Sequence, residues 1–314
     1  MNFALIGAAG FVAPRHIQAI YETGHRLIAA TDPHDSVGVL DRYFDDVRYF
    51  PEIERFDRHL EKLRRAGSDA RAHYVSICSP NYLHDAHVRL TLRLGAHAIC
   101  EKPLVIEPWN LDYLEQLEEE SATRVYTVLQ LRTHERLAGI KQALRETIPS
   151  SRLRVRLTYI SPRGPWYNVS WKGTEERSGG IAMNIGVHFF DLLIWLYGEP
   201  DKIEVHLKEP RKMAGFLELK NAEVEWFLSV DRGDFSDAFG TGGVVRSMRV
   251  EGREIDFSKG FQQLHTKVYE QILAGEGFGI ADARPSISLV HRLRETPVVK
   301  PSCGCHPMTK KYLG

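Results

Sequence analysis

The sequence has few cysteines and lacks the long apolar runs of membrane proteins. Its four cysteines are Cys78, Cys100, Cys303 and Cys305, and the first two lie in strand-like apolar stretches. Such sparse usage is typical of reduced thiols in a cytosol and argues against a disulfide framework. Charge or glycine interrupts every hydrophobic stretch before the roughly 20 residues that a transmembrane helix needs. The N-terminal apolar run lacks the preceding positive charges of a secretory leader. We therefore expect a soluble, cytoplasmic protein with no membrane partner.

An excess of charge of either sign is also missing. Lysine plus arginine and aspartate plus glutamate each number 41, so the formal net charge is zero. Without an overall basic field we expect no nucleic-acid partner, and a small charged substrate suits this balance better. The sequence Cys303-Gly304-Cys305-His306 offers three crowded ligands and no second pair, so we expect no metal site.

A change of hydrophobic pattern near residue 130 predicts two domains. Before it, apolar runs typical of strands alternate with helical spacings, which indicates a parallel sheet covered by helices on both faces. After it, residues 153–159, 203–207 and 224–230 alternate with period two, as in antiparallel sheets, and Glu251-Gly252 resembles a hairpin turn. We predict an α/β protein with a Rossmann dinucleotide-binding domain over 1–130. Over 131–314 we predict an α+β domain, with a largely antiparallel, open-faced sheet, for substrate binding and oligomerisation.

A glycine turn after the first predicted strand is a candidate cofactor site. Its spacing, G-x-x-G-x-x-A from Gly7 to Ala13, lets the backbone approach a pyrophosphate at the start of a helix. The alternative is a tight strand-to-helix turn without a ligand, because a loose glycine pattern is weak evidence. The residues expected to contact the cofactor here are Gly7, Ala9, Gly10, Phe11 and Val12.

Polar residues follow two further predicted strands. Asp32 comes directly after the second strand, where a carboxylate accepts hydrogen bonds from the adenosine ribose and repels a 2′-phosphate, which favours NAD over NADP. The alternative is that Asp32-Pro33 only starts a turn. Ser79, Asn81 and His84 follow the fourth strand at the carboxyl edge, where ligands of open parallel sheets bind. We expect Asn81 and His84 to line the nicotinamide side.

Three further motifs, with the glycine turn, resemble the Gfo/Idh/MocA oxidoreductase family. They are Ser79-Pro80-Asn81-x-x-His84, Glu101-Lys102-Pro103 and the stretch from Gly179 to Asp191. In that last stretch the family commonly has a carboxylate four residues before the histidine, and here Asn184 takes this place before His188. The departure removes one candidate proton acceptor and leaves His188 as the stronger base.

Other stretches are similar to one subgroup, the UDP-N-acetyl-2-amino-2-deoxyglucuronate 3-dehydrogenases (WlbA/WbpB type) of lipopolysaccharide O-antigen synthesis. This resemblance implies oxidation of the sugar C3 hydroxyl to a ketone with NAD, 2-oxoglutarate as an NADH-recycling acceptor in some members, and a homotetramer. Met183 replaces a threonine of the subgroup, so one polar contact near the substrate is expected to be missing. The similar stretches are Val128–Arg132, Arg163-Gly164-x-Trp166-Tyr167, Ser170-Trp171-Lys172, Asn184–His188 and Ala283–Ser286.

The resemblance implies that Lys102 and His188 are the catalytic residues. An imidazole titrates near neutrality and accepts a hydroxyl proton, while a lysine ammonium stabilises negative charge on the oxygen and disfavours imidazolium. Glu101 and Lys102 are both expected to contact the cofactor. Glu101 is also expected to fix Lys102 by hydrogen bonding, and the Lys102–Pro103 bond is expected to be cis. The alternatives are a buried, satisfied histidine and a surface lysine at a strand end.

A sugar nucleotide with a carboxylate and a diphosphate requires cations along its site. Arg163, Tyr167 and Lys172 fit this requirement, and the alternative is a basic surface loop. Gln130, together with Arg132, is expected to touch nicotinamide or to bind 2-oxoglutarate. The full set expected to bind substrate is Lys102, Arg163, Tyr167, Lys172, Asn184 and His188.

Two other functions stay open from the sequence. One is an NAD-dependent dehydrogenase of another sugar, inositol or amino sugar, and the other is a non-catalytic NAD-binding sensor. The presence of both Lys102 and His188 argues against the sensor.

Overall fold

The computed structural model describes residues 1–146, 151–235, 243–255 and 263–313, which form two compact units. The first unit comprises Met1–Thr133 and Gln262–Arg284, and the second comprises His134–Phe261 and Pro285–Gly314. The boundary expected at residue 130 lies close to the first crossing, but the sequence interpretation missed the return of 262–284 to the first unit. Hydrophobic periodicity reveals a helix but not its distant packing partner, so this return left no local signal.

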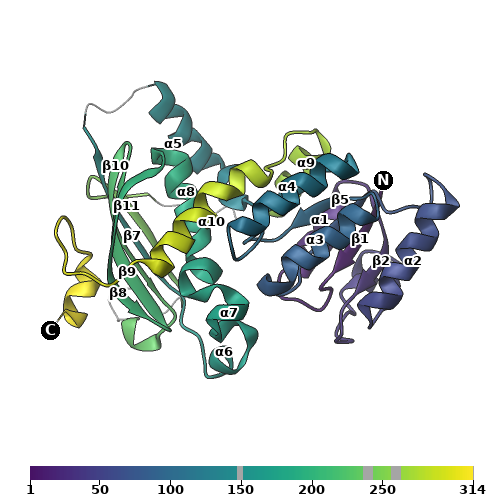
Figure 1. The fold of residues 1–314 in the computed structure, drawn as a ribbon, viewed down its shortest axis with the longest axis horizontal. Helices are drawn as coiled ribbons and strands as arrows, with labels where there is room; N and C mark the ends of the chain where they lie inside the picture. The colour runs from purple at the N-terminus through teal and green to yellow at the C-terminus, as the bar shows by residue number, and fades with distance from the viewer. Residues whose placement is uncertain (147–150, 236–242, 256–262, 314) are drawn as a thin grey trace. The chain divides into compact units, whose positions relative to one another are not determined.

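The first unit contains the parallel sheet that the alternating pattern predicted (Figure 1). Its spatial order is β3-β2-β1-β4-β5-β6, and every neighbouring pair is parallel. The order reverses between β1 and β4, which is where doubly wound sheets bind ligands. The strands are β1 (Asn2–Ile6), β2 (Arg26–Thr31), β3 (Arg48–Phe50), β4 (Tyr74–Ile77), β5 (His97–Cys100) and β6 (Val125–Thr127).

Helices pack around this sheet, and one of them comes from the returning segment. The buried side chains of α9 lie in the same core as those of α1, including Ile17 and Ile20 against Val268 and Tyr269. The Tyr269 ring also stacks on Phe3 of β1 at 5.9 Å between centroids. The helices are α1 (Ala13–Glu22), α2 (Ile53–Ala66), α3 (His84–Arg93), α4 (Trp109–Ser121) and α9 (Leu264–Leu273).

The second unit contains a mixed sheet of order β12-β11-β7-β10-β9-β8, in which only the central pair β7–β10 is parallel. Largely antiparallel pairing was predicted, but β9 was missed because nearly all its residues are buried and no polar alternation marks it. The predicted hairpin is confirmed: Glu251 and Gly252 have φ of 48° and 76°, as a two-residue turn requires. The strands are β7 (Leu153–Ile160), β8 (Pro200–Glu209), β9 (Lys212–Leu219), β10 (Ala222–Ser229), β11 (Val245–Val250) and β12 (Arg253–Glu254).

One face of this sheet is packed against helix and the other is partly covered by the C-terminal tail. Phe190 of α8 meets Trp226 of β10 edge to face at 5.2 Å. On the opposite face, His306 and Tyr312 of the tail stack on Phe227. The expected open face is therefore only partly open in the described residues. The helices are α5 (Glu135–Glu146), α6 (Trp166–Val169), α7 (Glu175–Ser178), α8 (Val187–Tyr197) and α10 (Ile280–Glu295), which starts in the first unit.

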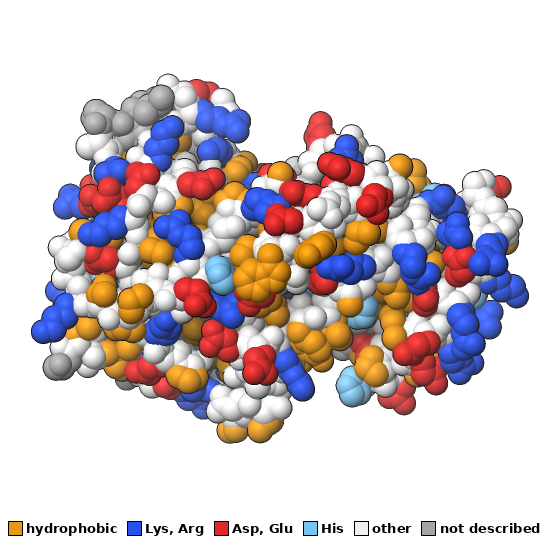
Figure 2. Space-filling model, in the orientation of Figure 1, with side chains coloured by type: hydrophobic (Ala, Val, Ile, Leu, Met, Phe, Trp, Pro, Cys, Tyr) orange, Lys and Arg blue, Asp and Glu red, His pale blue; other side chains and the backbone are white. Residues whose placement is uncertain are grey.

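The helical run Glu175–Tyr197 is long and apolar enough to cross a membrane by length and composition alone. However, 83% of its apolar window is buried inside the protein, as in a core helix. Gly179 and Gly180 have positive φ, and Gly179 ends α7, so glycine does interrupt this run as the sequence interpretation expected. On the face drawn in Figure 2, basic and acidic side chains are interspersed, consistent with the balanced composition.

Candidate active site

The glycine turn follows β1 and is wedged against the end of β4. Gly7 has φ of +88°, and a Cβ added there would lie 2.6 Å from the backbone carbon of Cys78. The Gly7 amide donates to the Thr31 carbonyl at 2.8 Å, and the Gly10 amide donates to the Gly7 carbonyl at 3.0 Å. Only glycine fits position 7, because both the backbone angle and the space exclude a side chain.

The turn leads directly into α1, which begins at Ala13. Val12 precedes the helix without a side-chain cap, and Ala13 is fully buried at its first position. Phe11 is 91% exposed, an unusual position for a large apolar side chain. The dipole of α1 makes the start of this helix a place suited to phosphate. Ala9 is half-buried, and its amide donates to Asp32 rather than to solvent.

Asp32 is buried at the end of β2 and ties the turn to the next loop. Its Oδ2 accepts from the Ala9 amide at 3.0 Å and its Oδ1 accepts from the His34 amide at 2.9 Å. The second bond is the Asp-Pro turn of the alternative interpretation. A carboxylate has lone pairs left for two further donors, so the turn and a ribose contact are compatible. The cradle at Gly7 and this carboxylate together fit an NAD adenosine diphosphate moiety.

Asp32→Asn is expected to weaken NAD binding about tenfold and to reduce discrimination against NADP, because a charge-assisted acceptor and the repulsion of a 2′-phosphate are both lost. Fluorescence titration with each dinucleotide measures both affinities. Asp35→Asn is the matched control, since Asp35 is exposed in the same loop. Equal NAD affinity in the Asp32 variant and the wild type would contradict the ribose contact.

His84 and Ser79, which follow β4, have hydrogen-bond partners within the protein. Both ring nitrogens of His84 contact backbone carbonyls, Nδ1 that of Pro103 at 2.6 Å and Nε2 that of Ser79 at 2.8 Å. This buried ring joins the loop after β4 to the loop after β5. The expected place of His84 on the nicotinamide side stays a prediction. Ser79 Oγ contacts His87 Nδ1 at 2.8 Å, and Asn81 is buried beside them in the chain.

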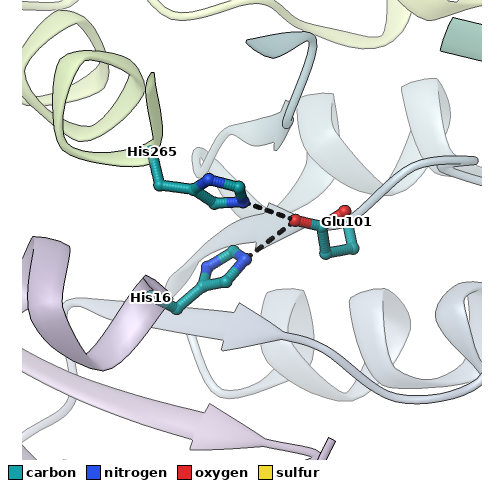
Figure 3. A group of neighbouring side chains, drawn as sticks. All are labelled: His16, Glu101 and His265. Carbon is teal, nitrogen blue, oxygen red and sulfur yellow. Dashed lines mark hydrogen bonds and ion pairs between the residues drawn. The ribbon is translucent and has the colours of Figure 1, made fainter. Parts of the chain in front are cut away.

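Lys102 follows β5, and its bond to Pro103 is cis, as expected. Glu101 is hydrogen-bonded to Lys102, as expected, through the Lys102 backbone amide. Its Oε1 contacts His16 Nε2 and His265 Nε2, each at 3.0 Å (Figure 3). Its Oε2 accepts from the Lys102 backbone amide at 3.3 Å. Both oxygens of the Glu101 carboxylate therefore have partners within the protein: Oε1 the two buried histidines, and Oε2 the Lys102 backbone amide. These contacts do not support the expected contact between this carboxylate and the cofactor.

His16 and His265 were not singled out from the sequence. His16 lies inside the buried face of α1, between Ala13 and Ile17, where an isolated histidine usually indicates a satisfied core residue. His265 begins α9, in a segment that was assigned to the other domain. Only the fold brings both rings to Glu101.

A short π-helix, Ala182–Gly186, precedes His188 in the second unit. Such wide turns occur often at functional sites. A Cβ at Gly186 would lie 2.6 Å from Leu228 Cδ1 and 2.8 Å from the Phe190 ring, so glycine allows this turn to pack on β10. The π-helix places Asn184 at 8% exposure and buries Met183 completely. His188 is half-buried in the first turn of α8. Met183 is apolar and completely buried, so its side chain does not replace the polar contact expected of the subgroup's threonine.

Four of the predicted substrate residues lie near one another in the second unit: Arg163, Tyr167, Lys172 and Asn184. Tyr167 is 2% exposed and hydrogen-bonded to Asn184; burial raises its pKa more than this bond lowers it. Burial, and then the charge of Arg163, lowers the pKa of Lys172, whose ammonium lies 4.5 Å from the centre of the Trp171 ring. Tyr167 and Lys172 line a cavity of about 350 Å³ that also includes Lys208 and Arg294. Burial of Tyr167 argues against a simple surface loop.

Gln130 and Arg132 lie in the 3₁₀ turn Gln130–Thr133 of the first unit. Arg132 donates to Asp282 Oδ1 at 2.8 Å and to the Asp282 carbonyl at 3.1 Å, and it lies over the Phe278 ring. These contacts indicate that Arg132 holds the returning segment. A 2-oxoglutarate contact from it is not supported. The half-buried Gln130 remains a candidate cofactor residue.

Comparison with known proteins agrees with this division. Residues 1–129 match the family described as "Oxidoreductase family, NAD-binding Rossmann fold", and residues 153–230 match its C-terminal alpha/beta domain. The WlbA (WbpB) dehydrogenase of Thermus thermophilus, solved with NAD and alpha-ketoglutarate and with NAD and UDP-GlcNAcA, is 46% identical. That alignment covers 96% of this chain and 97% of the other, with a TM-score of 0.91.

More distant relatives share parts of the chain or only its fold. The D-glucoside 3-dehydrogenase of Escherichia coli (strain K12) is 31% identical over 134 residues, 40% of this chain and 36% of that protein. The chain spans 36%, 56% and 57% of the first three curated relatives it matches. The WlbA dehydrogenase of Bordetella pertussis, 18% identical with a TM-score of 0.76 over 94% of this chain and 95% of the other, shares the fold. Since the two family matches cover well over half of the sequence, the chain belongs to the Gfo/Idh/MocA oxidoreductase family.

Proposed function

We propose that this protein uses NAD to oxidise the C3 hydroxyl of UDP-N-acetyl-2-amino-2-deoxyglucuronate to the 3-keto sugar, in the cytoplasm and for O-antigen synthesis. The observation that carries the proposal is the likeness, over nearly the whole of both chains, to a dehydrogenase solved with NAD and UDP-GlcNAcA. The glycine cradle, Asp32 and the buried substrate residues of the second unit support it.

In this proposal NAD, when bound, accepts the hydride from the carbinol carbon. The C3 hydroxyl proton moves to a ring nitrogen of His188, and the Lys102 ammonium stabilises the negative charge that develops on the oxygen. Lys102 belongs to the first unit and His188 to the second, so their meeting at the substrate is part of the proposal. The same positive charge disfavours imidazolium and keeps His188 able to accept the proton.

Binding of the sugar nucleotide is assigned to the second unit. Arg163 and Lys172 are placed to attract its phosphates or carboxylate, and Tyr167 with Asn184 offers neutral hydrogen-bonding groups. Because Lys172 is paired with aromatic rings rather than with a carboxylate in the described contacts, its ammonium favours an incoming anion.

Lys172→Met is expected to raise KM for the UDP-sugar acid about tenfold or more with little change in kcat, because a uniform binding contact is removed. The lowered pKa of Lys172 means that its charge is lost at a lower pH than in a free lysine, so wild-type KM should rise on the alkaline side and the variant's should not. Steady-state kinetics across pH measure both. Lys300→Met, at an exposed site of the same unit, serves as the control. A loss confined to kcat would contradict the assignment.

Two finer features are proposed with the function. NADH is reoxidised by 2-oxoglutarate, supported by the alpha-ketoglutarate complex of the Thermus enzyme. The protein forms a homotetramer, supported by the part of the second-unit sheet that its own tail leaves uncovered. Mass spectrometry of copurifying ligands and light scattering of the purified protein test these features.

Assay of the purified protein with UDP-GlcNAcA tests the main proposal. We expect reduction of the bound nicotinamide and a product two hydrogens lighter than the substrate. No change with this substrate would contradict the proposal. Equal turnover of sugars without the UDP group would instead favour a free-sugar dehydrogenase, a second candidate supported by the similarity to D-glucoside 3-dehydrogenase. NAD binding without turnover of any sugar would favour a sensor.

A further inference from the structure

A chain of buried polar side chains ends at Glu101, the residue before Lys102. Ser76 Oγ lies 2.5 Å from the Tyr269 hydroxyl, which lies 2.8 Å from His16 Nδ1. His16 Nε2 and His265 Nε2 each lie 3.0 Å from Glu101 Oε1 (Figure 3). The three residues drawn come from α1, the end of β5 and α9, so the chain joins three separate parts of the first unit.

The protons of this chain can be assigned without any other partner. Burial opposes ionisation of Glu101, but the hydrogen bonds from His16 and His265 outweigh it and hold the pKa of the carboxyl well below its ordinary value, so Glu101 is ionised. An ionised carboxylate only accepts, so both Nε2 atoms must carry protons. Burial lowers the pKa of His16, so its ring is neutral and Nδ1 accepts from Tyr269. The Tyr269 oxygen then accepts from Ser76, and every hydrogen bond has one donor.

Two histidines and a carboxylate are also a metal-ligating set. Their ligand atoms lie within 4.8 Å of one another, and such triads hold divalent metals in other proteins. The distances of 3.0 Å and the complete donor assignment are those of hydrogen bonds to a carboxylate, and they need no cation. Hydrogen bonding is therefore the interpretation that the geometry favours.

We propose that His16 and His265 are positioning residues that hold the Glu101 carboxylate beneath the Lys102 amide and so fix the backbone from which Lys102 reaches the substrate. Glu101 Oε2 accepts from the Lys102 amide at 3.3 Å, which is the link to the lysine. The inference rests on the proposed function, because it assumes that Lys102 stabilises the reacting oxygen. The inference adds that two helices together position Glu101. These are α1, which starts at the glycine turn and carries His16, and α9, which comes from far along the chain and carries His265.

Removing one histidine donor should act through Glu101. Its buried carboxylate then loses a proton donor, and desolvation drives its pKa upward. A protonated Glu101 is a weaker acceptor for the Lys102 amide, so the active form disappears on the acid side. The ionisable groups facing Glu101 or the rings that hold it are His16, His265, Cys78, Cys100, Tyr269, His84, Lys102 and Arg15.

His265→Leu and His16→Leu are expected to lower kcat about a hundredfold, because a shift of the lysine by about 1 Å has an effect of that size. His265→Gln and His16→Gln restore an N–H donor and should stay within about tenfold of the wild type. In the leucine variants the acid limb of the kcat profile should move to higher pH, and in the glutamine variants it should return. KM for NAD should change little throughout. His97→Gln, on the same strand as Glu101 but bonded to the Arg124 amide, is the control.

Two readouts do not depend on turnover. Hydrogen exchange of the Lys102 amide should accelerate in the leucine variants and be restored in the glutamine variants. Nitrogen NMR of the wild type should show His16 as the neutral Nε2–H tautomer. Tyr269→Phe, which removes only a hydroxyl, should disturb that tautomer and keeps the test valid if a leucine variant does not fold.

The outcomes separate the two proposals. An inactive wild type with the predicted exchange pattern and tautomer would contradict the proposed function while leaving the hydrogen-bonded chain in place. An active enzyme whose leucine and glutamine variants lose activity equally, with no shift of the acid limb, would overturn the positioning role. Stoichiometric zinc, iron or manganese by elemental analysis of the purified protein, lost in the histidine variants, would overturn it in favour of a metal site.

Discussion

Replacing Lys102 by alanine or His188 by asparagine is expected to lower kcat by about two to four orders of magnitude while NAD remains bound. In the proposed reaction the histidine takes the hydroxyl proton and the lysine stabilises the oxygen that loses it. Neither side chain belongs to the glycine cradle, so cofactor affinity should persist. Turnover of UDP-GlcNAcA and NAD titration, measured on the same preparations, check the two parts of this result.

The control variants carry the same two substitutions, lysine to alanine and histidine to asparagine, at positions outside the proposed site. Lys220→Ala exposes no buried group, because Lys220 lies on the surface of the second unit. His59→Asn alters a half-buried histidine of α2 that packs on Phe50. Both should keep nearly full activity. Undiminished turnover in the Lys102 or His188 variant would remove that residue from catalysis. Loss of NAD together with turnover in the Lys102 variant would make Lys102 a cofactor-binding residue instead.

Gly7→Ala is expected to cost about 2 to 4 kcal/mol of folding free energy and to abolish tight NAD binding. The new Cβ would lie 2.6 Å from the Cys78 backbone, at a φ of +88° that side chains rarely adopt. Backbone atoms at the end of β4 cannot yield as a flexible side chain would, so the turn must shift away from the phosphate position. Denaturant unfolding and dinucleotide titration measure the two effects.

Gly24→Ala separates the two causes. Gly24 also has a positive φ, +75°, but a Cβ there meets nothing within 4 Å. It should therefore show only the backbone strain, about 1 kcal/mol, and unchanged NAD affinity. If both variants bound NAD equally well, the close approach of Gly7 to β4 would not be what shapes the cofactor site.

Much of the fold was predictable because its signals are local. The runs of β1, β2, β4 and β5 are largely apolar, as is typical of strands buried on both faces, and the Glu251-Gly252 hairpin carries its own turn chemistry. The sequence interpretation missed β9 because nearly all its residues are buried, whereas β7, β8 and β10 of the same sheet were recognised by their alternation. The parallel pairing of β7 with β10 was equally invisible, since alternation shows which face is polar and not the direction of a neighbour.

The sequence identified residues that belong to the candidate site, but it did not always predict what each side chain contacts. The sequence pointed to Asp32, and the structure places its carboxylate against the turn. It also pointed to His84 and Glu101, and the structure assigns both to holding loops: His84 contacts two carbonyls, and Glu101 contacts two histidines. A motif marks residues that a site requires, and it does not distinguish a side chain that meets the ligand from one that positions its neighbour.

By itself the sequence determined that the first unit is a parallel sheet packed with helices, that a glycine turn lies at its switch point, and to which family the chain belongs. These features depend on short spacings and on residue types within one segment. Only the tertiary structure decided that α9 returns to pack on α1 and that His16 and His265 converge on Glu101. The physical reason is that a buried carboxylate must find donors wherever the folded chain brings them, and no local period records a contact between residues so far apart in the chain.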